Sequence, residues 1–297
     1  MSNLAQRLIT GTIFVIVLVG CIIWNQWSMF TLLFAITLLG MNEFYTLAHK
    51  AGAEPMRVGG VATGIMLLTS LFFWGIDNTI GHLLFICLLP IVFVLFLAEL
   101  WRKKSNPMAN IGWTLLGVIY VALPMALLAR AFGPRITHFQ GTIVTEYVVP
   151  YNYKGLLTLF ILIWVSDSMA YVCGRLLGKR KLWERISPKK TWEGFIGGLL
   201  FCVATGSALG YLWLSNHSFG SALLWGTIAL VVSVTGMFGD LVESMFKRSI
   251  DVKDSGTILP GHGGILDRFD AMFIAAPFAV AIYWLSPAIK QIINFVP

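Results

Sequence analysis

Three aspartates near the carboxyl end of the chain are the residues best suited to chemistry. Asp240 stands near the end of one apolar run, and Asp267 and Asp270 stand three residues apart at the start of the next. Carboxylate oxygens are the ligands that Mg²⁺ takes when it also binds substrate phosphates. This pattern predicts a metal-assisted reaction on phosphate. The alternative is that the three carboxylates only stabilise helix ends and pair with Lys247 and Arg268.

A glycine-rich segment lies between these aspartates. Residues 260–264 are Pro-Gly-His-Gly-Gly, and glycines let backbone N–H groups converge on an anion without obstruction by Cβ atoms. His262 could be a general base, or it could bond to the substrate or to the loop backbone. No second His or Cys stands near it, so zinc is not expected. The segment therefore predicts an anion-binding loop.

Polar residues also line one face of the helix expected before this loop. Asp240, Ser244 and Lys247 follow one another at spacings of four and three residues, so that in a helix they lie on the same side. An acid, a hydroxyl and a cation would then rise in order out of the membrane. The apolar run after the loop is expected to begin at about Leu266.

A fourth aspartate, Asp167, lies well inside an apolar run, where an unpaired charge costs several kcal/mol. It therefore needs a partner, which could be a salt bridge between helices, a serine hydroxyl, a substrate or a metal. Tyr171, Gly174, Arg175 and Gly178 follow at helical spacing and are expected to share its face.

Lysines and arginines are concentrated in residues 179–190. Ser187 is expected to cap the next helix, with Pro188 as its first residue. The positive end of a helix dipole beside Lys189 and Lys190 would form a phosphate site. The sequence has no GxxxxGK[ST] pattern, so this is not a P-loop.

The composition fixes the class of protein that must position these groups. The chain is 57% hydrophobic and 12% charged, whereas soluble domains are about 25% charged. Continuous apolar runs, without strand-like alternation, exclude a transmembrane β-barrel. We expect an all-α, polytopic integral membrane protein, with the candidate site at the cytosolic ends of the C-terminal helices.

Nine runs approach the roughly 20 residues that a helix needs to cross a bilayer. The second run is the shortest, and no repeat or linker divides the chain. We therefore predict a single membrane domain over residues 1–297, with a helical scaffold in 1–131 and catalytic helices and loops in 155–288. The runs are centred on 8–24, 28–42, 58–76, 80–98, 111–131, 155–174, 194–215, 218–239 and 269–288.

Most Lys and Arg residues fall on the side of the membrane that bears the N-terminus when nine spans alternate. This bias predicts a cell (inner) membrane protein whose N-terminus and polar loops are cytosolic and whose C-terminus is external. It also explains the net charge of +7, so nucleic acid is not an expected partner. Glu43, at the end of the second run, could be an interfacial group facing the cytosol or a cavity-lining residue.

The polar stretch resembles the signature of the phosphatidate cytidylyltransferase (CDP-diacylglycerol synthase) family of bacterial type. The similarity is specific over residues 155–270, and residues 1–150 resemble that family only in having several hydrophobic spans. The matching downstream positions are Ser244, Lys247, Arg248, Lys253, Asp254, Gly256, Pro260, His262, Gly263, Gly264, Asp267, Arg268 and Asp270. The matching upstream positions are Asp167, Tyr171, Gly174, Arg175, Ser187, Pro188, Lys189, Lys190 and Thr191.

The resemblance implies an enzyme of phospholipid biosynthesis that condenses CTP with phosphatidate to CDP-diacylglycerol and pyrophosphate. It also implies a homodimer that needs Mg²⁺, and K⁺ is reported for similar enzymes. The hypothesis is an in-line attack of the lipid phosphate on the α-phosphorus of CTP, with no protein nucleophile.

On this hypothesis, Asp240, Asp267 and Asp270 hold the metal. The expected catalytic residues are Asp240, Lys247, Arg248, Asp267 and Arg268. The expected substrate-binding residues are Asp167, Arg175, Ser187, Lys189, Lys190, Thr191, Ser244, Lys253, Asp254, His262, Gly263 and Gly264.

Two other functions are open. A transporter of an anionic solute would place its site near the bilayer midplane on related repeats, whereas here the charges gather at the ends of the runs and no repeat is visible. A CTP-using enzyme acting on another lipid, such as a polyprenol kinase or another lipid cytidylyltransferase, would share more of these features. The nucleotide product distinguishes the kinase from the cytidylyltransferases.

Overall fold

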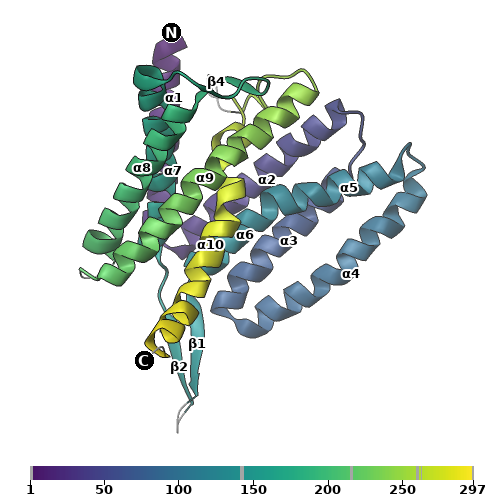
Figure 1. The fold of residues 1–297 in the computed structure, drawn as a ribbon. Coiled ribbons are helices and arrows are strands. Elements are labelled where there is room, and N and C mark those ends of the chain that lie inside the picture. The colour runs from purple at the N-terminus through teal and green to yellow at the C-terminus, as the bar shows by residue number, and fades with distance from the viewer. Residues whose placement is uncertain (1–2, 141–143, 215–216, 259–260, 262, 296–297) are drawn as a thin grey trace. The chain divides into compact units, whose positions relative to one another are not determined.

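The computed structural model describes residues 3–140, 144–214, 217–258, 261 and 263–295. The expected all-α class is confirmed, because most of the described chain is helical (Figure 1). The helices are α1 (Asn3–Trp24), α2 (Gln26–Lys50), α3 (Arg57–Ile76), α4 (Asn78–Arg102), α5 (Pro107–Gly117), η1 (Val118–Ala122), α6 (Leu123–Phe132), α7 (Tyr153–Leu177), α8 (Trp192–Leu209), η2 (Gly210–Leu214), α9 (Phe219–Ser249) and α10 (Leu266–Phe295).

Eight described helical stretches are long and apolar enough to cross a membrane, so this is a multi-pass membrane protein. The π-helical segments η1 and η2 lie inside two of them, Pro107–Phe132 and Trp192–Leu214. The first of the nine predicted runs corresponds to α1, whose apolar part, Leu8–Trp24, is shorter than the other eight.

The second predicted run, 28–42, is longer than expected. Asn25 caps α2 through its side-chain oxygen, which accepts hydrogen bonds from the N–H groups of Trp27 and Ser28. The helix then continues through Asn42 and Glu43 to Lys50. These polar residues do not end the helix. Their side chains form hydrogen bonds with other groups, so the hydrogen bonds of the helix backbone remain intact.

Two short antiparallel hairpins were not predicted. β1 (Arg135–Gln140) pairs with β2 (Val144–Val149) in the connection between α6 and α7. β3 (Lys181–Trp183) pairs with β4 (Ser187–Thr191) between α7 and α8. Each is a local pairing of neighbouring segments, which hydrophobic periodicity over a window of helical length does not detect.

The chain forms two compact units. The first unit contains residues 1–153 and 247–269, and the second contains 154–246 and 270–297, so α9 and α10 each contribute to both. The single membrane domain stays a prediction.

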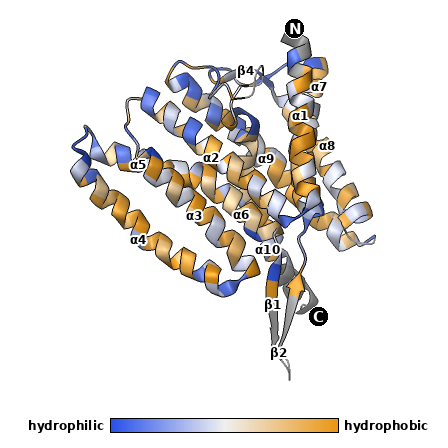
Figure 2. Cartoon of the chain, turned by 180° about the vertical axis from the view of Figure 1, so that it is seen from behind, coloured by the Kyte–Doolittle hydropathy of each residue, from blue (hydrophilic) through white to orange (hydrophobic). Residues whose placement is uncertain are grey.

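In the core of the first unit, an aromatic side chain packs directly against glycines. Tyr45 on α2 is fully buried and donates a hydrogen bond to the carbonyl of Thr114 at 2.8 Å. Side chains at Gly60 and Gly117 would collide with its ring, so both positions must lack a Cβ. By contrast, only 11% of the apolar window of α4 is buried, and this helix is coloured as hydrophobic along most of its length in Figure 2. Such a surface suits contact with lipid.

The second unit packs α7, α8 and α9 through small residues, as helices in membranes commonly do. A Cβ atom at Gly198 on α8 would lie 2.6 Å from the carbonyl oxygen of Ser166 on α7. The hydroxyl oxygens of Ser166 and Ser233 lie 2.8 Å apart and join α7 to α9. These close approaches set the distances between the polar side chains that the helices carry.

Candidate active site

Asp267 is the centre of a hydrogen-bond network in the first unit. Its side chain is 7% exposed and that of Lys247 is 13% exposed, and Lys247 Nζ donates to Asp267 Oδ1 at 2.6 Å. Asp267 Oδ2 accepts from the N–H of Ser255 at 3.0 Å, from the hydroxyl of Ser255 at 2.9 Å and from the N–H of Gly264 at 2.8 Å. Both carboxylate oxygens are therefore engaged with protein donors.

This network explains two of the glycines in the loop of residues 250–265 between α9 and α10, here called the α9–α10 loop. Gly263 has φ = +86°, a conformation that glycine adopts at low cost. A Cβ atom at Gly264 would collide with the Ser255 hydroxyl. The N–H of Gly264 is already bonded to Asp267, so that one group is not free to bind an anion. His262 lies outside the described residues.

Glu43 enters the same network from α2, which sequence reasoning did not foresee. It is only 6% exposed, so it is not an interfacial group facing water. Its Oε2 accepts hydrogen bonds from the N–H of Leu266 at 2.9 Å and from the hydroxyl of Ser255 at 3.2 Å. An acid at the end of an apolar run was the only sequence signal for this residue.

In the second unit, Asp240 near the carboxyl end of α9 pairs with Lys190 on β4. The hydroxyl of Ser244 donates to Asp240 Oδ1 at 3.2 Å, which confirms that these two residues share a helix face. Both members of the ion pair are partly exposed, at 27% for Lys190 and 37% for Asp240. The pair is thus accessible, and Asp240 could exchange this partner for a ligand.

Asp270 on α10 joins this acidic group within the second unit. It lies in the electrostatic field of Asp240, Asp167 and Lys190. A Cβ at Gly239 would lie 2.6 Å from the carbonyl oxygen of Asp270, so this glycine lets α9 and α10 approach closely at the two aspartates. Asp270 Oδ1 accepts a hydrogen bond from the adjacent Ala271 N–H at 2.7 Å.

Asp167 on α7 is exposed and lies in the electrostatic field of Asp240 and Lys190. Among the described residues, no hydrogen bond or salt bridge between helices satisfies it, and its neighbour Ser166 forms the contact to α9 instead. Arg175 on the same helix is also exposed, whereas Gly178 lies just beyond the last residue of α7. The predicted face is therefore helical only as far as Leu177.

The predicted helix cap at Ser187 is wrong. Residues 187–191 form strand β4, and Thr191 caps α8 by accepting a hydrogen bond from the N–H of Gly194 at 3.2 Å. Pro188 is compatible with this strand because proline is tolerated at a sheet edge. Lys189 and Lys190 therefore lie on a strand, and not in the first turn of a helix as the sequence suggested.

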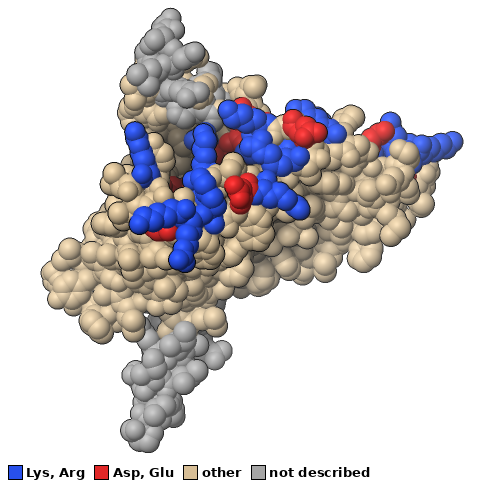
Figure 3. Space-filling view, turned by 45° about the horizontal axis from the view of Figure 1, so that its top comes forward, with Lys and Arg blue, Asp and Glu red and all other residues tan. Residues whose placement is uncertain are grey.

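Several predicted phosphate-binding residues are exposed cations without a described ion pair. In the first unit these are Arg248 and Lys253, and in the second unit they include Lys189. Arg268 and Asp254 are exposed as well. In Figure 3 the red carboxylate side chains lie among blue Lys and Arg side chains.

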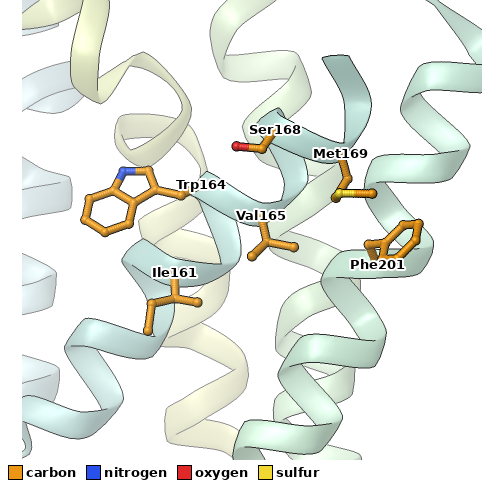
Figure 4. Close-up of a pocket in the computed structure, with 6 residues that line it drawn as sticks. All are labelled: Ile161, Trp164, Val165, Ser168, Met169 and Phe201. Atoms are coloured by element: carbon orange, nitrogen blue, oxygen red, sulfur yellow. The ribbon is translucent and has the colours of Figure 1, made fainter. Parts of the chain in front are cut away.

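An apolar groove of about 290 Å³ lies against α7 and α8 in the second unit (Figure 4). Trp164, Val165 and Met169 line it from α7, and Phe201 lines it from α8. Ser168, which follows Asp167 in the sequence, also borders it. Such a lining suits a hydrocarbon group and not a phosphate or a nucleotide.

The described residues contain no group of three His, Cys, Asp or Glu side chains close enough to enclose a metal ion. Mg²⁺ commonly binds one or two protein carboxylates and completes its shell with water and substrate phosphates. Asp240 and Asp270 meet that requirement, because they are oxygen donors brought near each other at the α9–α10 contact. Asp267 would have to give up a protein hydrogen bond to serve as a ligand.

Comparisons with known proteins bear on what this arrangement does. The chain matches the sequence profile of the cytidylyltransferase family over residues 5–286. A Bacillus subtilis (strain 168) protein named phosphatidate cytidylyltransferase is 32% identical over 282 residues, which cover 94% of this chain and 97% of that protein. A Haemophilus influenzae protein of the same name is 34% identical over 278 residues, covering 88% and 85%. One from Staphylococcus aureus (strain COL) is 50% identical over 122 residues, covering 41% and 46%.

Proposed function

We propose, because this chain belongs to the cytidylyltransferase family, that it is a phosphatidate cytidylyltransferase. The chain is a CTP-using nucleotidyltransferase of a multi-pass membrane class. The proposal that phosphatidate is the lipid substrate rests on one observation. The chain is similar, along nearly the whole of both chains, to proteins named phosphatidate cytidylyltransferase. A group of carboxylates and cations beside membrane-spanning helices suits an enzyme that must meet a soluble nucleotide and a lipid phosphate together.

The proposed reaction joins two phosphates. An oxygen of the phosphatidate phosphate forms a bond to the α-phosphorus of CTP, and the bond between the α-phosphorus and the oxygen bridging to the β-phosphate breaks. The products are CDP-diacylglycerol and pyrophosphate. The attacking phosphate is largely ionised near neutral pH, with a second pKa of about 6, so no protein nucleophile or strong base is needed. The protein then contributes positioning and charge neutralisation.

In the second unit, Asp240 and Asp270 are the proposed holders of Mg²⁺. When bound, such an ion would neutralise phosphate charge. Lys190 keeps Asp240 paired in the absence of ligand and can turn to a phosphate oxygen. The hydroxyl of Ser244 orients the Asp240 carboxylate. Asp167 is a further candidate for the metal or substrate.

In the first unit, we propose that Asp267 fixes the position of Lys247 and of the α9–α10 loop. The predicted metal role of Asp267 remains a proposal as well. Exposed cations would neutralise the phosphates of CTP and phosphatidate. These are Arg248, Lys253 and Arg268 in the first unit and Arg175 and Lys189 in the second.

The distribution of Lys and Arg supports a cytosolic N-terminus, cytosolic polar loops and an external C-terminus in the inner membrane. The proposal also includes a homodimer and a role for K⁺ beside Mg²⁺ such as that reported for similar enzymes, and both rest on the family resemblance.

The test is an assay of the detergent-purified protein with CTP, phosphatidate and Mg²⁺, leaving out each in turn. We expect pyrophosphate and CDP-diacylglycerol only when all three are present. Transfer of the γ-phosphate with CDP as product would identify a lipid kinase instead. Turnover with a different phosphorylated lipid but not with phosphatidate would identify another lipid cytidylyltransferase.

A further inference from the structure

Glu43 is a buried carboxylate in the first unit that the proposed reaction does not use. Burial of a charged group costs free energy unless hydrogen bonds replace water. Glu43 Oε2 accepts a hydrogen bond from the N–H of Leu266 and shares the hydroxyl donor of Ser255 with Asp267. Its Oε1 is buried and has no hydrogen-bond partner among the described residues. A residue that retains this cost in a helix of membrane-spanning length calls for an explanation.

The first contact of Glu43 caps α10. Leu266 is the first residue of that helix, and its N–H is one of those that have no partner within the helix itself. Glu43 accepts this hydrogen bond from α2, 223 residues earlier in the chain. A carboxylate near a helix N-terminus is also favoured by the helix dipole. Glu43 thereby holds the end of α10 against α2.

The second contact reaches Asp267 through one intermediate residue. The hydroxyl of Ser255 lies 3.2 Å from Glu43 Oε2 and 2.9 Å from Asp267 Oδ2. Asp267 in turn binds Lys247 Nζ. The one hydroxyl hydrogen of Ser255 can be donated to either carboxylate, so Ser255 is a donor that Glu43 shares with Asp267, the partner of Lys247.

Two glycines of the α9–α10 loop are shaped to this carboxylate. A Cβ atom at Gly256 would collide with Glu43 Oε1, and one at Gly264 would collide with Glu43 Oε2. Any larger residue at either position would push the loop away from α2. The loop therefore closes around Glu43, and the glycines serve this close approach as well as backbone freedom.

We propose that Glu43 is a positioning residue for the reaction, which anchors the α9–α10 loop and thereby sets the places of Asp267 and Lys247. It acts as a hydrogen-bond acceptor and does not touch substrate. The expected effect of Glu43 on turnover rests on the proposed function. The anchoring of the loop by Glu43 does not depend on which substrate the protein uses.

Two substitutions at Glu43 distinguish the effect of the hydrogen-bond acceptor from the effects of the charge and of the side-chain volume. Glu43→Gln keeps the length and one acceptor oxygen but removes the charge. Glu43→Met keeps the length and volume but removes the acceptor. Glu99→Gln is the matched control, because Glu99 is also a buried acid of the first unit but accepts from Arg102 and Asn110, away from the loop.

Two readouts are needed, at a temperature where all variants are folded. The first is kcat for CDP-diacylglycerol formation, where we expect Glu43→Met to lose about 100-fold, since small misplacements cost this much. Glu43→Gln should lose no more than about fivefold. The second is amide hydrogen exchange of the peptide 253–266, which Glu43→Met should accelerate about tenfold, as loss of a hydrogen bond predicts. Glu99→Gln should change neither.

The proposal is overturned if Glu43→Met retains wild-type kcat, or if kcat falls while loop exchange stays unchanged. It is also overturned if Glu43→Gln is as inactive as Glu43→Met, because charge and not positioning would then be required. Wild-type protein that makes no CDP-diacylglycerol would instead remove the proposed function. The exchange comparison would in that case still support or overturn Glu43 as the anchor of the loop.

Discussion

Asp267 and Asp270 stand three residues apart on α10, yet one belongs to the first unit and the other to the second, and their surroundings are opposite. Asp267 is surrounded by donors, namely an ammonium group, a hydroxyl and two backbone N–H groups. Asp270 accepts from the N–H of its neighbour Ala271 and otherwise faces the charges of Asp240, Asp167 and Lys190.

The difference separates two uses of a carboxylate. An acid whose oxygens are saturated by protein donors holds backbone in place, and its removal leaves those donors unsatisfied. An acid placed among other acids is held in an unfavourable field, which an added cation relieves. Aspartates that look alike in the sequence are thus expected to respond differently to the same substitution.

The largest effect is expected at Asp270. Asp270→Asn should lower CDP-diacylglycerol formation by about 1000-fold, because it removes a proposed metal ligand. The midpoint of thermal unfolding in detergent should stay the same or rise, because repulsion from Asp240 and Asp167 is reduced. A variant with activity within tenfold of wild type would remove Asp270 from the proposed metal site.

Asp267→Asn should lose both activity and stability. An amide group in place of one oxygen faces either Lys247 or the Ser255 and Gly264 donors, and disruption of such a buried pair costs about 3 kcal/mol of unfolding free energy. We expect about a 100-fold loss of turnover.

Asp251→Asn is the matched control for this change. Asp251 is exposed in the same loop at φ = +52°, which asparagine tolerates. Both activity and unfolding midpoint should remain at wild-type values in the control. Equal stability of Asp267→Asn and wild type would show that the network around Asp267 contributes nothing to the fold.

Lys190→Met tests the acidic group of the second unit. It removes the cation paired with Asp240, so Mg²⁺ should bind more tightly and half-saturate activity at a lower concentration. Turnover at saturating Mg²⁺ should fall about tenfold, because a cation that neutralises phosphate is lost. Lys181→Met, which changes an exposed lysine of β3, is the control. A half-saturating concentration that rises or stays constant would contradict the competition between Lys190 and metal at Asp240.

The smallest effect is expected at Thr191, next to Lys190. Thr191→Ala should lower the unfolding free energy by about 1 kcal/mol through loss of the α8 cap, and Thr191→Ser should restore it. Thermal unfolding of the two variants measures the difference. Ser187→Ala should leave the unfolding free energy unchanged. If it lowered the unfolding free energy as much as Thr191→Ala does, Ser187 would be the helix cap, as the sequence suggested.

The sequence by itself determined the membrane class, the approximate location of the membrane-spanning helices, the start of α10 at Leu266 and the shared face of Asp240 and Ser244. These features are local. The length of an apolar run and the spacing of residues along one helix depend only on residues close together in the sequence. The geometry of a single helix is enough to interpret them.

Only the tertiary structure decided which side chains meet. The bond from Ser255 to Glu43 spans 212 residues, and the pairing of Lys190 with Asp240 depends on a strand where a helix was expected. Such contacts depend on how closely helices and loops approach one another, which glycines such as Gly239 on α9 and Gly264 in the α9–α10 loop permit. Periodicity along one helix carries no information about the partner of that helix. The difference between Asp267 and Asp270 therefore becomes visible only when their neighbours are in place.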